Sequence, residues 1–223
     1  MTSPANAATD QPEAAPRSPR RRRVLSGAAL AGLAALTLLI GGGALQPARA
    51  DDTAAAQAFI EKLGDEAIGF LSDKSLTPEQ RATKFAALFQ DKFAVESIAR
   101  FVAGAAWRAA PEAEQKEYVD LFTNFVVNTY AQRLSSYSGE KLKVGAARAI
   151  DDSVVVNSEI VQQNGPPTKV DWRLRSTSDG FKILDVIIEG ISMAITQRSD
   201  FAADARNGLN GLIAALKRNR FSQ

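Results

Sequence analysis

The chain has 223 residues, with 27 Lys and Arg against 25 Asp and Glu, and it contains neither histidine nor cysteine. Without these two residue types it cannot form a Ser-His-Asp triad, a cysteine nucleophile, a histidine-ligated zinc site or a disulfide. Most common catalytic sites and thiol redox chemistry are therefore excluded.

The first 50 residues have the composition of an export signal. Four arginines at 20–23 precede an apolar run at 27–45, and Ala48-Arg49-Ala50 follows it. This order is typical of a signal peptidase substrate cleaved after Ala50, and the Arg-Arg-x-Val-Leu spacing resembles a twin-arginine signal. We expect residues 1–50 to be a cleavable leader and residues 51–223 a single exported domain. An uncleaved membrane anchor is the alternative.

Removal of the leader changes the sign of the net charge. Residues 51–223 carry 21 Lys and Arg against 23 Asp and Glu, a net charge of −2. Nucleic-acid binding needs a concentrated basic face, and a nearly neutral domain gives it no support. A chain of this length suits one domain with a sizeable core.

Apolar residues recur at intervals of three and four in the first half of the domain, which predicts helices. One helix starts at Thr77, which can cap it, with Pro78 in the first turn and Gln80 completing a capping box. Gly104 is expected to end another. With that starting at Thr77, the expected helices cover about 53–71, 95–102, 112–136, 193–206 and 209–218.

From about residue 141 the apolar period changes to two, which predicts strands. Short turn-forming segments separate the strands, so we expect an antiparallel meander. The domain is therefore expected to be α+β, with a curved antiparallel sheet of about four strands packed against helices. The expected strands cover about 142–150, 154–162, 168–176 and 181–188.

The last expected strand is apolar on both faces, although a strand with one face in water should alternate. Perfect alternation places Leu184, Val186 and Ile188 on one face and Ile183 and Ile187 on the other. One carboxylate, Asp185, lies among them. The pattern is compatible with a catalytic acid in an apolar site, with a lipid-lined pocket, or with a buried structural aspartate.

Two long segments resemble a known family. They are RFVAGAAWRAAPEAEQKEYVDLFTNFVVNTYAQRL at 100–134 and VDWRLRSTSDGFKILDVIIEGISMAITQRSDF at 170–201. Both resemble the MlaC or toluene-tolerance family of periplasmic phospholipid-binding shuttle proteins and the related hopanoid-associated HpnM proteins. The most specific pieces are the Phe-x-x-Gly-x-x-Trp segment at 101–107, the Asp-Gly turn, and DVIIEGISM at 185–193.

The resemblance implies a monomeric periplasmic carrier that needs no cofactor and is not an enzyme. Phospholipid acyl chains would lie in an internal apolar cavity. The implied partners are an outer-membrane lipoprotein and porin complex and an inner-membrane ABC transporter with an MCE-domain protein, which together maintain outer-membrane lipid asymmetry. Two alternatives stay open. One is a hopanoid cargo, favoured by the unusual leader, and the other is an isomerase-like enzyme that uses Asp185 as its base.

The same resemblance implies which positions bind lipid. Arg173 is the candidate for contact with the head group, whereas Asp185 and Glu189 are expected to fix the bend after the last strand by hydrogen bonds. No catalytic or metal-binding residue is expected. The implied cavity wall consists of Phe101, Trp107, Phe125, Tyr130, Val154, Val156, Val170, Trp172, Leu174, Val186, Ile188, Ile191 and Met193.

Overall fold

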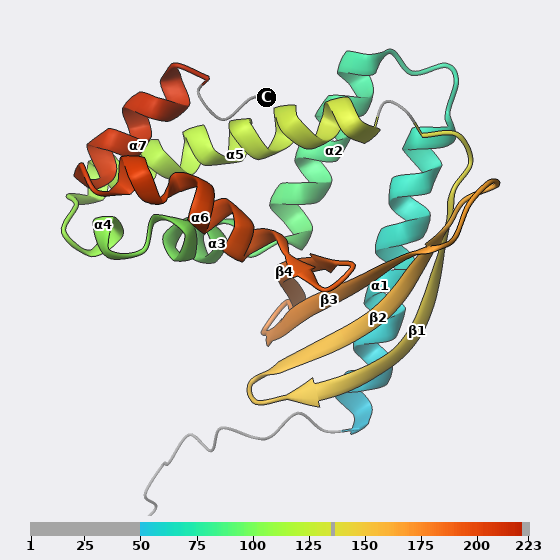
Figure 1. Ribbon diagram of the computed structural model, residues 1–223. Helices are drawn as coiled ribbons and strands as arrows, with labels where there is room; N and C mark the ends of the chain where they lie inside the picture. The colour runs from blue at the N-terminus through green and yellow to red at the C-terminus, as the bar shows by residue number, and fades with distance from the viewer. Residues whose placement is uncertain (1–49, 135–136, 220–223) are drawn as a thin grey trace, which may run out of the picture. The chain divides into compact units, whose positions relative to one another are not determined.

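The computed structural model describes residues 50–134 and 137–219 (Figure 1). The chain divides into two units, Met1–Gly43 and Ala44–Gln223, and the described residues belong to the second. Apart from Ala50, the expected leader and its arginine motif lie outside the described residues, so the leader and its cleavage stay predictions.

The described residues form seven helices and five strands, and the predicted α+β class is confirmed. Every expected helix and strand is present. The elements α4 and β5 are not expected from the sequence, because segments of four and two residues are too short to show a period. The helices are α1 (Ala50–Ser72), α2 (Pro78–Lys92), α3 (Val95–Ala103), α4 (Ala105–Arg108), α5 (Glu112–Leu134), α6 (Met193–Ala205) and α7 (Gly208–Lys217). The strands are β1 (Lys141–Ile150), β2 (Ser153–Val161), β3 (Thr168–Thr177), β4 (Gly180–Ile188) and β5 (Ile191–Ser192).

The capping box expected at the start of α2 is present. The Thr77 hydroxyl accepts a hydrogen bond from the Gln80 backbone N–H at 3.2 Å, and the Gln80 side chain accepts one from the Thr77 N–H at 2.8 Å. Pro78 occupies the first turn, where no intrahelical donor is needed. These local interactions determine where the chain leaves the loop after α1 and begins α2.

All five strands form one antiparallel meander in the order β1-β2-β3-β4-β5. Trp172 pairs with Val156 on one side and Val186 on the other, so these three side chains share one face. The next pair along β3 and β4 is shifted, because Leu174 is opposite Ile183 rather than Leu184. Leu184 is thus the extra residue of a β-bulge.

The bulge corrects the expected distribution of side chains on β4. It places Ile183 on the same face as Val186 and Ile188, whereas Asp185 and Ile187 lie on the opposite face. The expectation that Ile183 and Ile187 share a face is therefore wrong, because it assumes unbroken alternation. The sheet has one apolar face, and the other carries polar residues such as Asp185.

Two clusters of buried residues share the core. In the first, α1 packs along β1 and β2 (Figure 1). In the second, α3, α5, α6 and α7 pack around Tyr118, whose ring lies 6.4 Å from that of Trp107 and 6.0 Å from that of Phe122. Burial raises the pKa of the Tyr118 hydroxyl, which therefore stays neutral. Within the described ranges, none of the helices has the length and apolar character needed to cross a bilayer.

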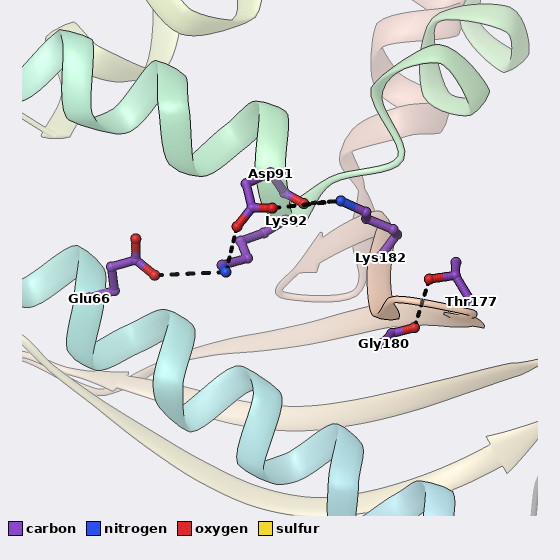
Figure 2. Close-up of polar contacts among 6 residues, drawn as sticks. All are labelled: Glu66, Asp91, Lys92, Thr177, Gly180 and Lys182. Carbon is purple, nitrogen blue, oxygen red and sulfur yellow. Dashed lines mark hydrogen bonds and ion pairs between the residues drawn. The ribbon is translucent and has the colours of Figure 1, made fainter.

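Polar contacts join α1, α2 and β4 at one end of the sheet (Figure 2). Lys182 of β4 donates to the backbone carbonyl of Asp91, and Lys92 lies 2.6 Å from the Asp91 carboxylate and 4.0 Å from that of Glu66. The hydrogen bond from Lys92 lowers the pKa of Asp91. Such exposed pairs contribute little to stability. A backbone hydrogen bond of 2.9 Å from Ala94 to Ile183 adds a main-chain link between the helices and β4.

The contact between α6 and α7 depends on a glycine. A Cβ atom added at Gly211 would collide with the backbone carbonyl of Asp204 and would lie 2.7 Å from Cβ of Asn207. We expect Gly211→Ala to lower the free energy of unfolding by about 1–3 kcal/mol, as overpacking does elsewhere. At Gly69 of α1 an added Cβ meets nothing within 4 Å. The matched change Gly69→Ala should therefore raise stability by about 0.5–1 kcal/mol. Urea denaturation measures both, and equal effects would contradict the close approach.

Candidate functional site

An apolar cavity of about 270 Å³ lies between the apolar face of the sheet and the helices. Side chains from β2, β3 and β4 form one wall, and side chains from α2, α3, α5 and α6 form the other. Asp185 is the one charged residue among the described residues that line it. The lining residues are Phe85, Phe89, Phe93, Ile98, Phe122, Val126, Tyr130, Ile160, Val170, Trp172, Leu184, Asp185, Val186, Ile188, Met193, Ala194 and Gln197.

The strand wall depends on the register of β3 and β4. Val170 pairs with Ile188 and Trp172 with Val186, which brings four apolar side chains together beyond the part of the sheet that α1 covers. The indole N–H of Trp172 donates to the Ser158 hydroxyl at 2.9 Å, and that hydroxyl donates to the Val170 carbonyl at 2.9 Å. Trp172 therefore presents hydrocarbon to the cavity, because its polar atom is already satisfied.

The helix wall is built from side chains spaced by four residues. On α2 the rings of Phe85 and Phe89 lie 6.3 Å apart, and the ring of Phe93, which directly follows the helix, lies 4.7 Å from that of Phe89. On α5, Phe122, Val126 and Tyr130 follow the same spacing. Residues four apart lie on one face of a helix. The resemblance did not point to Phe85, Phe89 or Phe93, although this spacing could have identified them.

Hydrogen bonds hold the bend between β4 and α6. The Asp185 carboxylate accepts from the Ser192 hydroxyl at 2.5 Å and from the Ala194 backbone N–H at 3.0 Å, and Ser192 also caps α6 by accepting from Ile195. The Glu189 carboxylate accepts from the Lys169 backbone N–H at 2.6 Å. The expected structural roles of Asp185 and Glu189 are confirmed by these contacts, which place Met193 and Ala194 at the cavity.

The structure brings together six of the positions implied by the resemblance. Tyr130, Val170, Trp172, Val186, Ile188 and Met193 line the cavity. The Tyr130 hydroxyl lies 3.8 Å from Sδ of Met193, which joins α5 to α6 across it.

The other implied positions lie elsewhere. Val154, Val156 and Leu174 are fully or almost fully buried in the cluster beneath α1, because α1 covers that end of the apolar face. Phe125 packs against Phe201, with ring centroids 5.6 Å apart. Ile191 on β5 is 59% exposed. The three remaining positions, Phe101, Trp107 and Arg173, line a separate groove next to the cavity.

That groove has a volume of about 1160 Å³ and lies between α3, α4, the start of α6, and β3 and β4. Four residues line both hollows: Ile98, Leu184, Asp185 and Ala194. The groove and the cavity therefore adjoin at the bulge of β4.

The chemistry of the cavity favours binding over catalysis. Both oxygens of its single carboxylate, Asp185, accept hydrogen bonds that hold the backbone. In the described part of the chain, no group of three or more acidic residues is placed to hold a metal ion. The cavity is smaller than the roughly 300–1,000 Å³ of pockets for drug-sized ligands, so a long chain needs it to widen.

Comparisons with known proteins agree with this geometry. The sequence model of the MlaC protein family matches residues 61–218, and the chain belongs to that family. A curated relative, the intermembrane phospholipid transport system binding protein MlaC of Haemophilus influenzae, is 25% identical over 97 residues. That match covers 41% of this chain and 45% of the relative, so it spans less than half of either protein.

A solved structure has a similar fold. It is that of the phospholipid-binding protein from Ralstonia solanacearum in complex with a phospholipid, with a TM-score of 0.65 and 25% sequence identity. The similarity covers 73% of this chain and 95% of that protein. The arrangement of helices on a sheet is therefore shared over almost the whole of the Ralstonia protein.

Removal of the Asp185 carboxylate should destabilise the start of α6. In Asp185→Ala the Ser192 hydroxyl and the Ala194 N–H lose their acceptor, and we expect the free energy of unfolding to fall by about 1–3 kcal/mol. The control is Asp200→Ala, at an exposed position on the same helix, which should change stability by less than about 0.5 kcal/mol. Thermal denaturation compares the two, and an equal effect would contradict the assigned role.

Proposed function

We propose that this protein is a periplasmic carrier that holds the acyl chains of a phospholipid in the apolar cavity and moves the lipid between the two membranes. The observation that carries the proposal is the cavity lining. Most of its described residues are apolar, and their one carboxylate, that of Asp185, already accepts two hydrogen bonds. Membership of the MlaC family and the phospholipid bound in the Ralstonia relative support it.

The energetics suit a lipid. Each methylene group removed from water contributes about 0.8 kcal/mol, so an acyl chain binds by the area that it buries and needs few polar contacts. Flexible or flat side chains such as Met193 and the phenylalanines of α2 can rearrange as the cavity fills. We expect the lipid-bound protein to have a wider cavity, with α2 and α5 displaced from β3 and β4.

The route of transport is part of the proposal. The expected leader would bring the domain to the periplasm as a monomer, where it would receive or deliver lipid at an outer-membrane lipoprotein and porin complex and at an inner-membrane ABC transporter with an MCE-domain protein. The name of the Haemophilus relative, which describes intermembrane phospholipid transport, supports this route. The head group would lie at the end of the cavity next to Arg173, which lines the adjoining groove.

The isomerase alternative has less support from the geometry. A catalytic base needs a lone pair directed at the substrate, whereas the oxygens of Asp185 accept hydrogen bonds from Ser192 and Ala194. A hopanoid would also fit an apolar cavity, and the identity of the extracted lipid separates it from a phospholipid.

The first experiment is native mass spectrometry with solvent extraction of the protein expressed as the full chain and purified from the periplasm. We expect one diacyl phospholipid per molecule. A bound hopanoid in place of the phospholipid would assign the protein to the hopanoid-associated branch. A protein that is empty and takes up neither lipid from vesicles would contradict the carrier function.

A charge inside the cavity should abolish lipid binding. Val186 lines the cavity, and Val186→Glu would place a carboxylate among acyl chains, where an unpaired charge is strongly unfavourable. We expect the co-purifying lipid to be lost while circular dichroism shows a folded protein. Val161→Glu is the control, since Val161 is a 39% exposed β2 residue outside the cavity, and it should retain lipid. Lipid retained at the wild-type level in Val186→Glu would contradict the assignment of the cavity.

A further inference from the structure

The groove beside the cavity is strongly basic. Asp185 is the one carboxylate among the described residues that line it, and it accepts hydrogen bonds from Ser192 and Ala194 at the start of α6. Residues 51–223 as a whole carry a net charge of −2, so the local charge of the groove has the opposite sign to that of the domain. Five arginines line the groove: Arg100, Arg108, Arg173, Arg175 and Arg198.

Arg198 is held in place by the Phe-x-x-Gly part of the family motif. Its guanidinium donates to the carbonyl of Phe101 at 2.9 Å and lies 4.9 Å from the centre of the Phe101 ring. Gly104 has a φ of +59°, and a Cβ added there would lie 3.1 Å from Nη2 of Arg198. The motif therefore provides a platform on which one guanidinium lies, with other N–H groups left for an anion.

A second arginine is also positioned by the fold. Nε of Arg173 donates to the Ser153 hydroxyl at 3.1 Å, which orients the guanidinium over β3. Among the described residues, the side chains of Arg100 and Arg108 have no hydrogen bond or ion pair. The groove thus combines two oriented guanidinium groups with cations that are available to a ligand.

The groove adjoins the cavity, and this decides between a lipid and a separate anionic partner. Ile98, Leu184 and Ala194 are apolar residues that line both hollows. An acyl chain in the cavity would therefore end next to the arginines of the groove. A molecule that fills both must be apolar at one end and anionic at the other. A guanidinium group can donate two parallel hydrogen bonds to two oxygens of one phosphate, and the head group of a phospholipid contains such a phosphate.

We propose that the arginine groove makes the carrier selective for phospholipids whose head group has a net negative charge, such as phosphatidylglycerol, over zwitterionic ones. Both kinds bring a phosphate to the guanidinium groups. A zwitterionic head group also brings an ammonium group, which the guanidinium groups repel; among the five, Arg175 is the one with an ion-pair partner in the described residues, Asp152 at 3.9 Å. The proposal rests on the carrier function and specifies the class of lipid that it transports.

The test uses uptake from mixed vesicles. Protein expressed as the full chain and freed of lipid is incubated with vesicles of equal parts phosphatidylglycerol and phosphatidylcholine with identical acyl chains, and the bound lipids are quantified by mass spectrometry. We expect the wild-type protein to be enriched in phosphatidylglycerol by about two- to fivefold at low ionic strength, as for charge pairs open to solvent. Salt should reduce the enrichment, because it screens these charges.

Two double variants remove charge from the groove. Arg173→Gln/Arg198→Gln should bring the ratio of the two bound lipids to that of the vesicles. Arg100→Gln/Arg108→Gln alters exposed side chains without such contacts, and should lower the ratio even if the first pair impairs folding. The control removes the same charge at exposed arginines outside the groove, Arg206→Gln/Arg218→Gln, and should keep the wild-type ratio.

Each outcome separates the two levels of the proposal. Equal uptake of both lipids by the wild-type protein would overturn the selectivity and leave the carrier function intact. An enrichment that survives in both groove variants, or that the control variant loses equally, would overturn the role of the arginines. Absence of both lipids would instead overturn the carrier function on which the proposal rests.

Discussion

The fold depends on one constraint, which is that the sheet has a single apolar face too large for α1 to cover. α1 packs along β1 and β2 and buries the end of the face that contains Val156 and Leu174. At the other end α2, α5 and α6 face β3 and β4 across a gap. Apolar surface left in water is unfavourable, so the free energy falls when this uncovered part of the face is buried, either by closer packing or by an apolar ligand. The gap is the cavity.

The bulge at Leu184 connects this constraint with the polar contacts around the site. By shifting the register it keeps Val186 and Ile188 on the apolar face and places Asp185 on the opposite one, next to the start of α6. Asp185 then holds that helix by its N-terminus, where a carboxylate is favoured by the helix dipole. The bulge therefore contributes, together with the packing of α6 against α3 and α7, to the position of Met193 in the cavity and of Arg198 in the groove.

The order of elements could be predicted from the sequence because each long element has a clear period and clear ends, as the capping box at Thr77 shows. The face of each side chain on β4 could not, since the bulge at Leu184 depends on the pairing with β3. The same limit applies to the site. Val154 and Leu174 are apolar strand residues like Val170, and only the tertiary position of α1 decides that they are core and that Val170 lines the cavity.

Composition also conceals how charge is distributed. A domain with a net charge of −2 gives no sign of a basic site, yet the arginines of α3, α4, β3 and α6 gather in one groove, where Asp185 is the one acidic residue among the described lining residues. These arginines come from three segments that are far apart in the sequence. The approach of α6 to α3, with Arg198 lying on Phe101 and Gly104, brings Arg198 close to Arg100 and Arg108. The contacts that place α6 against the cavity therefore also form the basic groove. Because Met193 in the cavity and Arg198 in the groove lie on the same helix, any movement of α6 would displace the apolar wall and the cationic groove together.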